Sequence, residues 1–471
     1  MEKVDYEPLR RTIMSALIRL RDWPLWRMVP QGFEVAASAV FVLLIARRDL
    51  PESHLLTALK RRVSGIPKLI RDSIDAVDEP YELWIEYAKG VGLGLPNLLN
   101  SVKGLGKELG DEELVEECDR VSEEVRKLVE KLGDLRERAR PGYKPMGREL
   151  LERFLYSTFI EMGVDELREL GYREAERYRK LMAEAAREVG FPSVEEALSA
   201  LRKRVPRDPE EVLKVYRETV ERVRRFVIEA GVVELPPMER VEVVETPEFI
   251  KHVIPFAAYI PPEVFGVSSR GTFLVTKPWS KEMLEHHDIY SIINTVVHEA
   301  YPGHHVQLSY LRLSPSIVRK YIIEPADFVE GWAHYCEELM LELGIERDPL
   351  YKLKVYHDAL WRAVRVYLDI ELSTGSIDFD KAVEKLSRDA YLPRDGARAE
   401  VLRYTMVQGA TLSYCYGKAR ILELKKRVRE VLGPLYSDKL FHRLLLEEGN
   451  LPLAVLSEVV LDKARKLASS R

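Results

Sequence analysis

The sequence predicts a mainly helical, elongated protein of two lobes with one small β-sheet. Its 471 residues exceed the roughly 250–300 residues at which a single hydrophobic core stops growing. Apolar residues recur three and four positions apart over long stretches, which is the spacing of one helix face. Only residues 237–280 contain short β-branched runs between Pro and Gly. We therefore expect helices throughout, with the sheet in the middle of the chain.

Residues 1–140 are predicted to form an amino-terminal helical region. One helix face is especially clear, and it consists of Leu114, Val115, Cys118, Val121, Val125, Leu128, Val129 and Leu132. The helical pattern breaks at Arg140-Pro141-Gly142, which we interpret as a lobe boundary. Residues 141–471 form the second region, which contains the candidate site, and we expect the two lobes to interleave.

Two helix starts and three strands are predicted before the candidate site. Ser193 begins a Ser-x-x-Glu capping box, and Asp208-Pro209 begins the next helix. The strands fall at residues 241–244, 256–259 and 272–275. Because an extended peptide can bind to a sheet edge through backbone bonds, residues 271–276 are a candidate peptide-binding strand. A purely structural hairpin is the equal alternative.

The histidine-rich stretch at residues 298–305, HEAYPGHH, is predicted to be an interrupted zinc-binding helix. On an unbroken helix His304 would lie about 240° around the axis from His298, and His305 about 10 Å along it. Looping out the intervening Pro-Gly pair restores His-Glu-x-x-His, in which two histidines hold zinc and the glutamate is the general base. We predict His298 and His304 as ligands, Glu299 as the base, and His305 as a supporting residue.

A second helix face downstream supplies the third ligand. Glu330, His334 and Glu337 are spaced four and three apart, so they share one face of a helix whose neighbouring residues are small or apolar. Buried carboxylates are rare unless they are paired or bound to metal. We predict Glu330 as the third ligand of one zinc ion per chain, with Asp327 as the weaker alternative. His334 and Glu337 are assigned to supporting or substrate-binding roles.

Chance is a poor explanation for this cluster. Six of the ten histidines lie between His286 and His334. A lone buried histidine would be interpreted as a core residue with a satisfied hydrogen bond, but several histidines beside glutamates favour a metal site.

Composition excludes several classes of protein. A formal net charge of −5 without a basic tract argues against nucleic-acid binding. The three cysteines lie far apart, which indicates a reducing compartment and no disulfides. The charged amino terminus is unlike a secretory signal, and the most apolar run, residues 35–46, is shorter than the ~20 residues that span a membrane. We expect a cytoplasmic protein with no membrane partner, and leave a homodimer open.

Amide side chains are scarce beside abundant Glu, Lys and Arg. This balance is typical of thermophilic proteins, so we expect a thermophilic source.

Two segments resemble a known family. HEAYPGHHVQ (298–307) and FVEGWAHYCEELM (328–340) are similar to the family catalogued as domain of unknown function 885. We interpret that family as zinc peptidases distantly similar to thimet oligopeptidase and the thermostable helical carboxypeptidases. The similarity continues at Arg365 and Asp369, Glu400 to Tyr404, Leu412-Ser413-Tyr414, and Phe441-His442, whereas Ser373 and residues 408–411 depart from the family pattern.

The resemblance implies a helical fold with a deep channel, zinc held by the two motif histidines and the downstream glutamate, and hydrolysis of peptides. It also adds His442 to the candidate site.

Peptide hydrolysis further requires a donor for the developing oxyanion. Tyr414 is the candidate donor, with Tyr416 and Tyr404 behind it. A core tyrosine with a satisfied hydroxyl is the equal alternative for each.

Arg365 and Arg403 could each bind a carboxylate through two N–H groups. The partner is either Asp369 or Glu400 within the protein, or the free C-terminus of a peptide. We expect internal pairing, because Arg365 and Asp369 stand at i, i+4 on one predicted helix.

The predicted function is that of a zinc-dependent peptidase, of the carboxypeptidase or oligopeptidase type, acting on short peptides. A di-metal redox protein of the helical-bundle type is one alternative, although that class requires Glu-x-x-His twice. A metal-binding scaffold without peptidase activity is the other.

Overall fold

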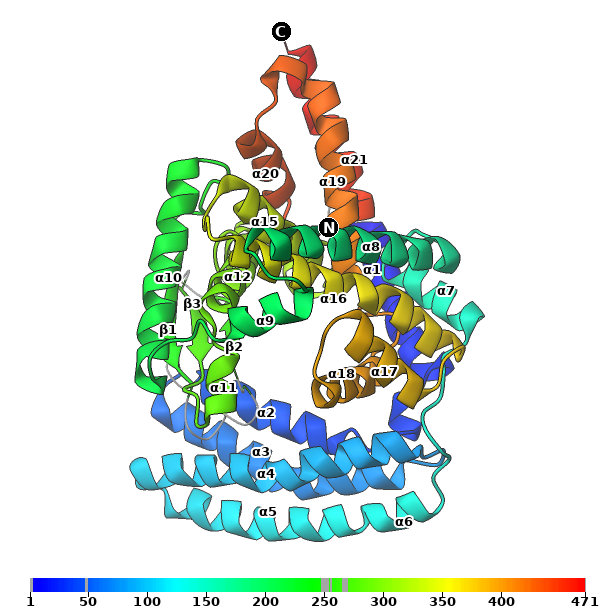
Figure 1. Cartoon of the computed structure of the whole chain (residues 1–471). Helices are drawn as coiled ribbons and strands as arrows, with labels where there is room; N and C mark the ends of the chain where they lie inside the picture. The colour runs from blue at the N-terminus through cyan, green and yellow to red at the C-terminus, as the bar shows by residue number, and fades with distance from the viewer. Residues whose placement is uncertain (1–2, 47–49, 247–253, 255, 265–269, 471) are drawn as a thin grey trace. The chain divides into compact units, whose positions relative to one another are not determined.

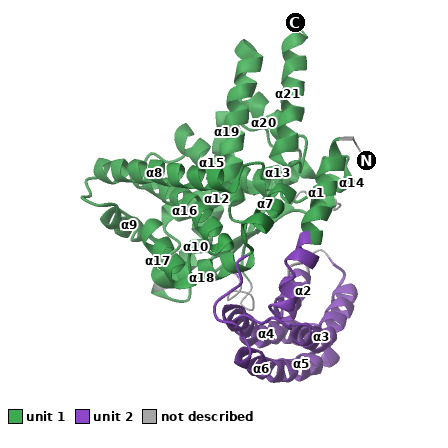
Figure 2. Cartoon of the chain, turned by 90° about the vertical axis from the view of Figure 1, so that its right-hand side faces the viewer, with its two compact units in different colours: residues 1–17, 146–246, 256–471 green, residues 18–145, 247–255 purple. Residues whose placement is uncertain are grey.

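The computed structural model describes residues 3–46, 50–246, 254, 256–264 and 270–470. The chain forms two compact units (Figure 2). The larger comprises Met1–Leu17, Met146–Thr246 and Phe256–Arg471, and the smaller comprises Ile18–Pro145 and Pro247–Pro255. The helical pattern in the sequence thus breaks close to Pro145, where the main segment of the smaller unit ends, and the first 17 residues lie with the larger unit.

The smaller unit is helical. Its α-helices are α2 (Gly32–Ala46), α3 (Glu52–Asp75), α4 (Glu82–Glu108), α5 (Glu112–Glu130) and α6 (Leu132–Glu137). The apolar face predicted from Leu114 to Leu132 is buried. Asp111 caps the start of α5, because its carboxylate accepts a hydrogen bond from the Leu114 N–H at 3.0 Å. Apolar burial on one face and a capped first turn therefore explain this helix.

The larger unit contains the rest of the helices and the sheet (Figure 1). Before the sheet come α1 (Tyr6–Leu17), α7 (Arg148–Ser157), α8 (Val164–Glu188), α9 (Val194–Arg202) and α10 (Pro209–Ala230). After it come α11 (Lys281–Glu285), α12 (Ile289–Glu299), α13 (His304–Leu311), α14 (Ile317–Tyr321), α15 (Ala326–Leu343), α16 (Pro349–Thr374), α17 (Phe379–Asp389), α18 (Arg394–Met406), α19 (Ser413–Leu432), α20 (Asp438–Leu446) and α21 (Leu453–Ser469). The predicted caps are confirmed, because Ser193 and Asp208 accept N–H bonds at the starts of α9 and α10.

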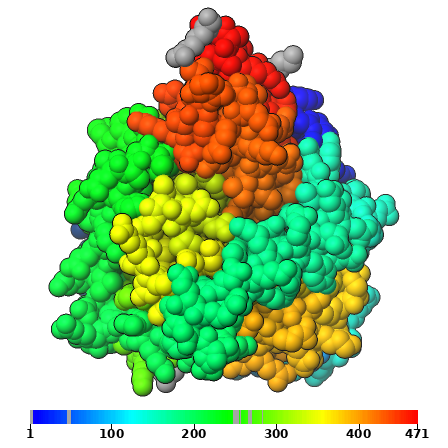
Figure 3. Space-filling view, turned by 45° about the horizontal axis from the view of Figure 1, so that its top comes forward, coloured from blue at the N-terminus to red at the C-terminus, as the bar shows by residue number. Residues whose placement is uncertain are grey.

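Two long helix pairs form the framework around the candidate site. The first pair is α16 and α8, which pack along each other, and the second is α15 and α19. The second pair meets without side chains between the backbones, because a Cβ atom on Gly331 would lie 2.6 Å from Gly417 backbone atoms. Figure 3 shows the packing from outside, with the yellow segment at the end of α15 and the start of α16 between the teal-green α8 and the orange α19. Small residues thus let α19 approach the helix of Glu330.

The sheet has three strands in the order β1 (Arg240–Glu245), β3 (Arg270–Val275), β2 (Ala257–Ile260). The central strand β3 pairs in parallel with β1 and antiparallel with β2. Both edges of β3 are therefore occupied, so the prediction that residues 271–276 bind a peptide as an added strand is wrong. The predicted small sheet is confirmed.

The predicted fold class is confirmed, since the chain is mainly helical with one small mixed sheet. In the part of the chain that the structure describes, no single helix is long and apolar enough to cross a membrane. One pair, Tyr6–Arg27 with Gly32–Leu44, reaches that length and composition together but is bent by 110°.

Candidate metal centre

The histidine motif occupies the end of one helix and the start of the next. α12 ends at Glu299, the loop Ala300–Gly303 follows, and α13 begins at His304. The loop turns back on α12, because the Gly303 N–H donates to the Val297 carbonyl at 3.1 Å, and it includes the cis peptide Tyr301-Pro302. The predicted two-residue bulge within one helix is therefore wrong, since four residues leave the helix and two separate helices supply the histidines.

His298, His304 and Glu330 nevertheless converge. Their ligand atoms all lie within 4.8 Å of one another. Glu330 Oε2 lies 3.7 Å from His298 Nε2 and 3.6 Å from His304 Nε2. Tetrahedral zinc with bonds of about 2.0–2.1 Å places its ligand atoms roughly 3.3 Å apart. The three predicted ligands are thus already close to the spacing that one metal ion requires.

The environment of these atoms fits a cation. Glu330 Oε2 is buried and has no hydrogen-bond partner among the described residues. The nitrogens at 3.6–3.7 Å are too far for hydrogen bonds. A buried carboxylate oxygen without a donor is costly, whereas a metal ion would satisfy it. Two imidazoles and one carboxylate are also the donor set of an open zinc site.

The charges in this group are tightly coupled. Burial alone would raise the pKa of Glu330, but the neighbouring His298 and His304 lower it to about 2. Burial would lower the pKa of His298, yet Glu330 and Glu337 raise it to about 10. Burial and the nearby His298 both lower the pKa of His304. In the absence of metal, the group therefore holds one cationic and one neutral imidazole.

Glu337 orients His298 by bonding the ring nitrogen that does not face the triad. Its Oε1 lies 2.6 Å from His298 Nδ1, the nitrogen that faces away from Glu330. Arg362 holds the same carboxylate at 2.8 Å, and the Asn294 amide donates to Oε2 at 3.2 Å. A carboxylate on Nδ1 keeps Nε2 free for a metal ion and makes it more basic. Glu337 therefore supports the metal centre, as predicted, through His298.

We predict that Glu337→Gln weakens zinc affinity about 10- to 100-fold, the usual cost of losing such a partner. The amide has half the acceptors and no charge, so it orients the His298 ring less firmly. The measurement is a competition titration with a chromogenic zinc chelator. Glu342→Gln is the control on the same helix, because Glu342 is exposed and should leave the affinity unchanged.

His305 points away from the triad. Its Nδ1 lies 2.7 Å from the Tyr259 hydroxyl and its Nε2 3.0 Å from Glu239 Oε2. The same carboxylate accepts a hydrogen bond from Tyr301 in the loop and pairs with Arg224 at 2.8 Å. The predicted supporting role of His305 thus consists in fixing the loop that leads to His304.

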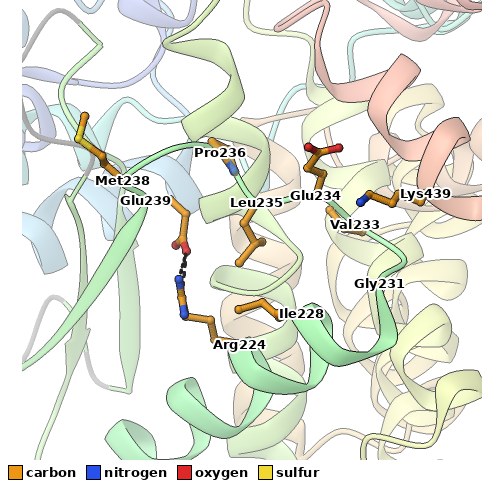
Figure 4. Close-up of a pocket in the computed structure, with 10 residues that line it drawn as sticks. All are labelled: Arg224, Ile228, Gly231, Val233, Glu234, Leu235, Pro236, Met238, Glu239 and Lys439. Carbon is orange, nitrogen blue, oxygen red and sulfur yellow. Dashed lines mark hydrogen bonds and ion pairs between the residues drawn. The ribbon is translucent and has the colours of Figure 1, made fainter.

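A cavity of about 370 Å³ lies next to this network (Figure 4). Arg224 and Glu239 line it, together with apolar residues such as Ile228 and Leu235 and the amine of Lys439. Because its lining includes none of the predicted site residues, this cavity is separate from the candidate metal centre.

Tyr414 and His334 contact each other. His334 Nδ1 lies 3.3 Å from the Tyr414 carbonyl oxygen. Burial lowers the pKa of His334 well below its usual value, so the imidazole is neutral. Burial and the charge of Glu330 raise the pKa of Tyr414 to about 12, and its hydroxyl has no hydrogen-bond partner among the described side chains. Tyr414 is therefore a protonated donor close to the candidate centre.

Arg365 does not pair with Asp369, but the expected pairing within the protein is present, because both arginines bond Glu400. Arg365 instead donates to the Tyr404 hydroxyl at 2.8 Å and to Glu400 at 3.3 Å. Arg403 donates to the same Glu400 oxygen at 2.9 Å. Asp369 is turned away from Arg365 and accepts hydrogen bonds from Ser373, the Gly409 N–H and Thr411. The loop between α18 and α19 supplies the donors Gly409 and Thr411, and α16 itself supplies Ser373.

Three other predicted residues lie outside the centre. The Tyr416 hydroxyl accepts the Glu161 N–H at 3.2 Å, in the loop between α7 and α8. Asp327 accepts the Leu453 N–H at the start of α21, so it is not the third ligand. His442 bonds the Val232 carbonyl and Tyr335, and its ring packs 5.4 Å from Trp332.

Trp332 connects His442 to the centre. The indole N–H donates to the Pro302 carbonyl at 2.9 Å, which fixes the loop before His304. His442 therefore acts at a distance, through a packed ring, rather than by contact with a ligand or substrate.

Several residues that contact the predicted site residues are not predicted from the sequence. Asn294 precedes His298 by four residues, so the shared helix face was a signal that could have identified it. Arg362 and Glu239 had no such signal, because Glu239 meets His305 across 66 residues of chain.

Comparison with known proteins places the chain in a family. Residues 1–460 match the family described as "Bacterial protein of unknown function (DUF885)". The chain belongs to this family. The DUF885 match spans both units, and among curated proteins no relative matches.

Two solved structures share this fold. A candidate lipoprotein of unknown function from Shewanella oneidensis superposes with a TM-score of 0.77 at 21% identity, covering 97% of this chain and 87% of that one. A candidate lipoprotein from Colwellia psychrerythraea gives a TM-score of 0.76 at 21% identity, covering 88% of this chain and 77% of that one. The expectation of a cytoplasmic protein is contradicted by these descriptions, because a lipoprotein is anchored to a membrane.

Proposed function

We propose that this protein is a zinc-dependent peptidase that hydrolyses short peptides. The observation that carries the proposal is the convergence of His298 Nε2, His304 Nε2 and Glu330 Oε2 beside Glu299. Two histidines and one glutamate leave a fourth zinc position for water or substrate. When bound, zinc supplies a Lewis acid that acidifies water and polarises a carbonyl group.

Glu299 is the proposed general base. It is half-buried at the end of α12, next to His298 in sequence. Its charge acts on both histidines and favours their protonated forms, which supports this role. The carboxylate takes a proton from the attacking water and returns it to the leaving amine.

Tyr414 is the proposed oxyanion donor. A preorganised donor near the reacting carbonyl stabilises the charge that develops on its oxygen. With a pKa raised to about 12, the phenol keeps its proton at neutral pH. The Tyr414 hydroxyl is available to donate a hydrogen bond to the substrate, because it has no hydrogen-bond partner among the described side chains.

The edge strand β2 is the proposed binding site for the substrate backbone. Within the described residues, β2 pairs only with β3, and Tyr259 of β2 bonds His305. An extended peptide added to β2 would gain backbone hydrogen bonds that do not depend on its sequence.

The test is a mixture of defined oligopeptides incubated with zinc-loaded protein and with Glu299→Gln, with products identified by mass. We expect cleavage by the wild type and at least about 100-fold slower cleavage by the variant, since a general base contributes 10²–10⁴-fold. Both proteins should hold one zinc ion per chain, because Glu299 is not a ligand.

Each other outcome has a definite meaning. Two iron ions per chain would favour the di-metal redox alternative. Stoichiometric zinc without cleavage of any peptide would favour a metal-binding scaffold. Equal cleavage by wild type and Glu299→Gln would remove Glu299 from the mechanism.

A further inference from the structure

A group of arginines lies beside the proposed oxyanion donor. The guanidinium carbons of Arg362 and Arg365 lie 5.7 and 5.3 Å from the centre of the Tyr414 ring. Both arginines come from α16. Arg403 of α18 joins them through Glu400, whose Oε2 accepts from Arg403 at 2.9 Å and from Arg365 at 3.3 Å.

The charges in this group do not balance. Arg362 pairs with Glu337, whereas Arg365 and Arg403 share the single carboxylate of Glu400. One positive charge is left over. Arg365 is only 7% exposed and pairs with Glu400 at 3.3 Å, so the remaining positive charge lies at the exposed end of the group, on Arg403. Asp369, four residues further along α16, does not neutralise this charge, because it accepts a hydrogen bond from Gly409 in the loop before α19.

The Arg365 guanidinium is held in place by its neighbours, but one of its nitrogens has no hydrogen-bond partner among the described residues. Its carbon stacks 4.3 Å over the Trp361 ring, and Nε donates to Tyr404. Nη2 donates to Glu400, while Nη1 has no partner among the described residues. Arg403 is exposed, and among the described residues it bonds only through Nη2. The free N–H groups of both side chains can bind a further carboxylate.

Tyr414 connects this group to the metal centre. Arg365 and Arg362 both lie against its ring, at 5.3 and 5.7 Å from the ring centre, and Arg362 Nη2 lies 3.4 Å from His298 Nδ1. A peptide advances by about 3.3–3.6 Å per residue. A carboxylate bound at the arginines would therefore leave one of the last peptide bonds of the substrate near the triad.

We propose that Arg365 and Arg403 bind the free α-carboxylate of the substrate, so that the protein removes one or two residues from the C-terminus of a peptide. This inference rests on the proposed peptidase function. The substrate class is a short peptide with a free C-terminal carboxylate, and its charge balances the surplus of the arginine group.

The test compares two peptides of one sequence, one ending in a free acid and the other in an amide. Binding is measured calorimetrically with zinc-loaded Glu299→Gln, in which the peptides stay intact. We expect the acid to bind about 100-fold more tightly than the amide. Adding Arg403→Gln or Arg365→Gln should bring this ratio close to one, while Arg403→Lys should keep part of it. Arg398→Gln, on α18 and exposed, is the control and should keep the full ratio.

The two proposals fail in different ways. If the acid and the amide bind equally, or if the ratio survives both arginine substitutions, carboxylate binding is overturned. Wild-type protein that cleaves acid and amide peptides at equal rates keeps the peptidase function and also overturns carboxylate binding. An Arg403-dependent preference for the acid without cleavage of any peptide keeps carboxylate binding and overturns the peptidase function.

Discussion

Replacing His304 with alanine is expected to abolish stoichiometric zinc binding. The variant leaves His298 and Glu330 as the remaining ligands, and losing one of three protein ligands should weaken zinc binding by more than the roughly 10- to 100-fold lost with an outer partner. We expect the wild type to retain one zinc ion per chain after dialysis and His304→Ala to retain almost none, as measured by elemental analysis.

The neighbouring histidine provides the matched control. His305→Gln removes an imidazole one position away that bonds Tyr259 and Glu239 rather than facing the triad. It should keep zinc near one ion per chain. Zinc retained by His304→Ala but lost from His305→Gln would reassign the ligand and contradict the convergence of the three side chains.

A thermal measurement gives a second readout that is independent of activity. A metal that binds only the folded state stabilises it by about 2.7 kcal/mol at a concentration of 100 Kd. Adding zinc should therefore raise the Tm of the wild type and of His305→Gln, and should leave the Tm of His304→Ala unchanged.

The metal ligands could be predicted from sequence because their chemistry is local. A histidine pair with a proline and glycine between, and a glutamate on a buried helix face, restrict the choices strongly. The shape of the connection could not be predicted, because where α12 ends depends on the Gly303 N–H bond to Val297 and on the Trp332 indole from another helix.

Partners across the fold were harder to predict than ligands. The pairing of Arg365 with Asp369 followed from helix geometry alone, yet Asp369 finds backbone and hydroxyl donors in a loop that begins 40 residues later. Helix geometry alone could have excluded Tyr416 from the site. Two residues along a helix rotate a side chain by about 200°, so Tyr416 points away from Tyr414. Strand order has no signal in the sequence, which is why β3 was mistaken for an edge.

The departures from the family pattern meet at one place. Ser373 donates to Asp369 at 2.8 Å, and Thr411 donates to the other oxygen of the same carboxylate at 2.7 Å. Two changes far apart in the chain therefore satisfy one buried acid. These hydrogen bonds stabilise the loop before Tyr414. The two departures therefore do not favour the alternative of a metal-binding scaffold without peptidase activity.

Replacing Gly303 with alanine is expected to disrupt the metal centre through the backbone alone. A Cβ atom there would lie 1.8 Å from the His298 carbonyl oxygen and 2.5 Å from that of Val297. Neither carbonyl can move without unwinding the end of α12, which holds His298.

We expect Gly303→Ala to lower the free energy of unfolding by about 1–3 kcal/mol, the usual cost of overpacking, and to lose zinc as His304→Ala does. Denaturant unfolding and zinc content measure the two effects. Gly396→Ala is the control, because its Cβ would meet nothing within 4 Å and alanine favours a helix. Full zinc content and unchanged stability in Gly303→Ala would contradict the close contact with His298. Loss of zinc with little loss of stability would instead indicate that the loop relaxes by moving His304, since the ligands tolerate displacement less than the fold does.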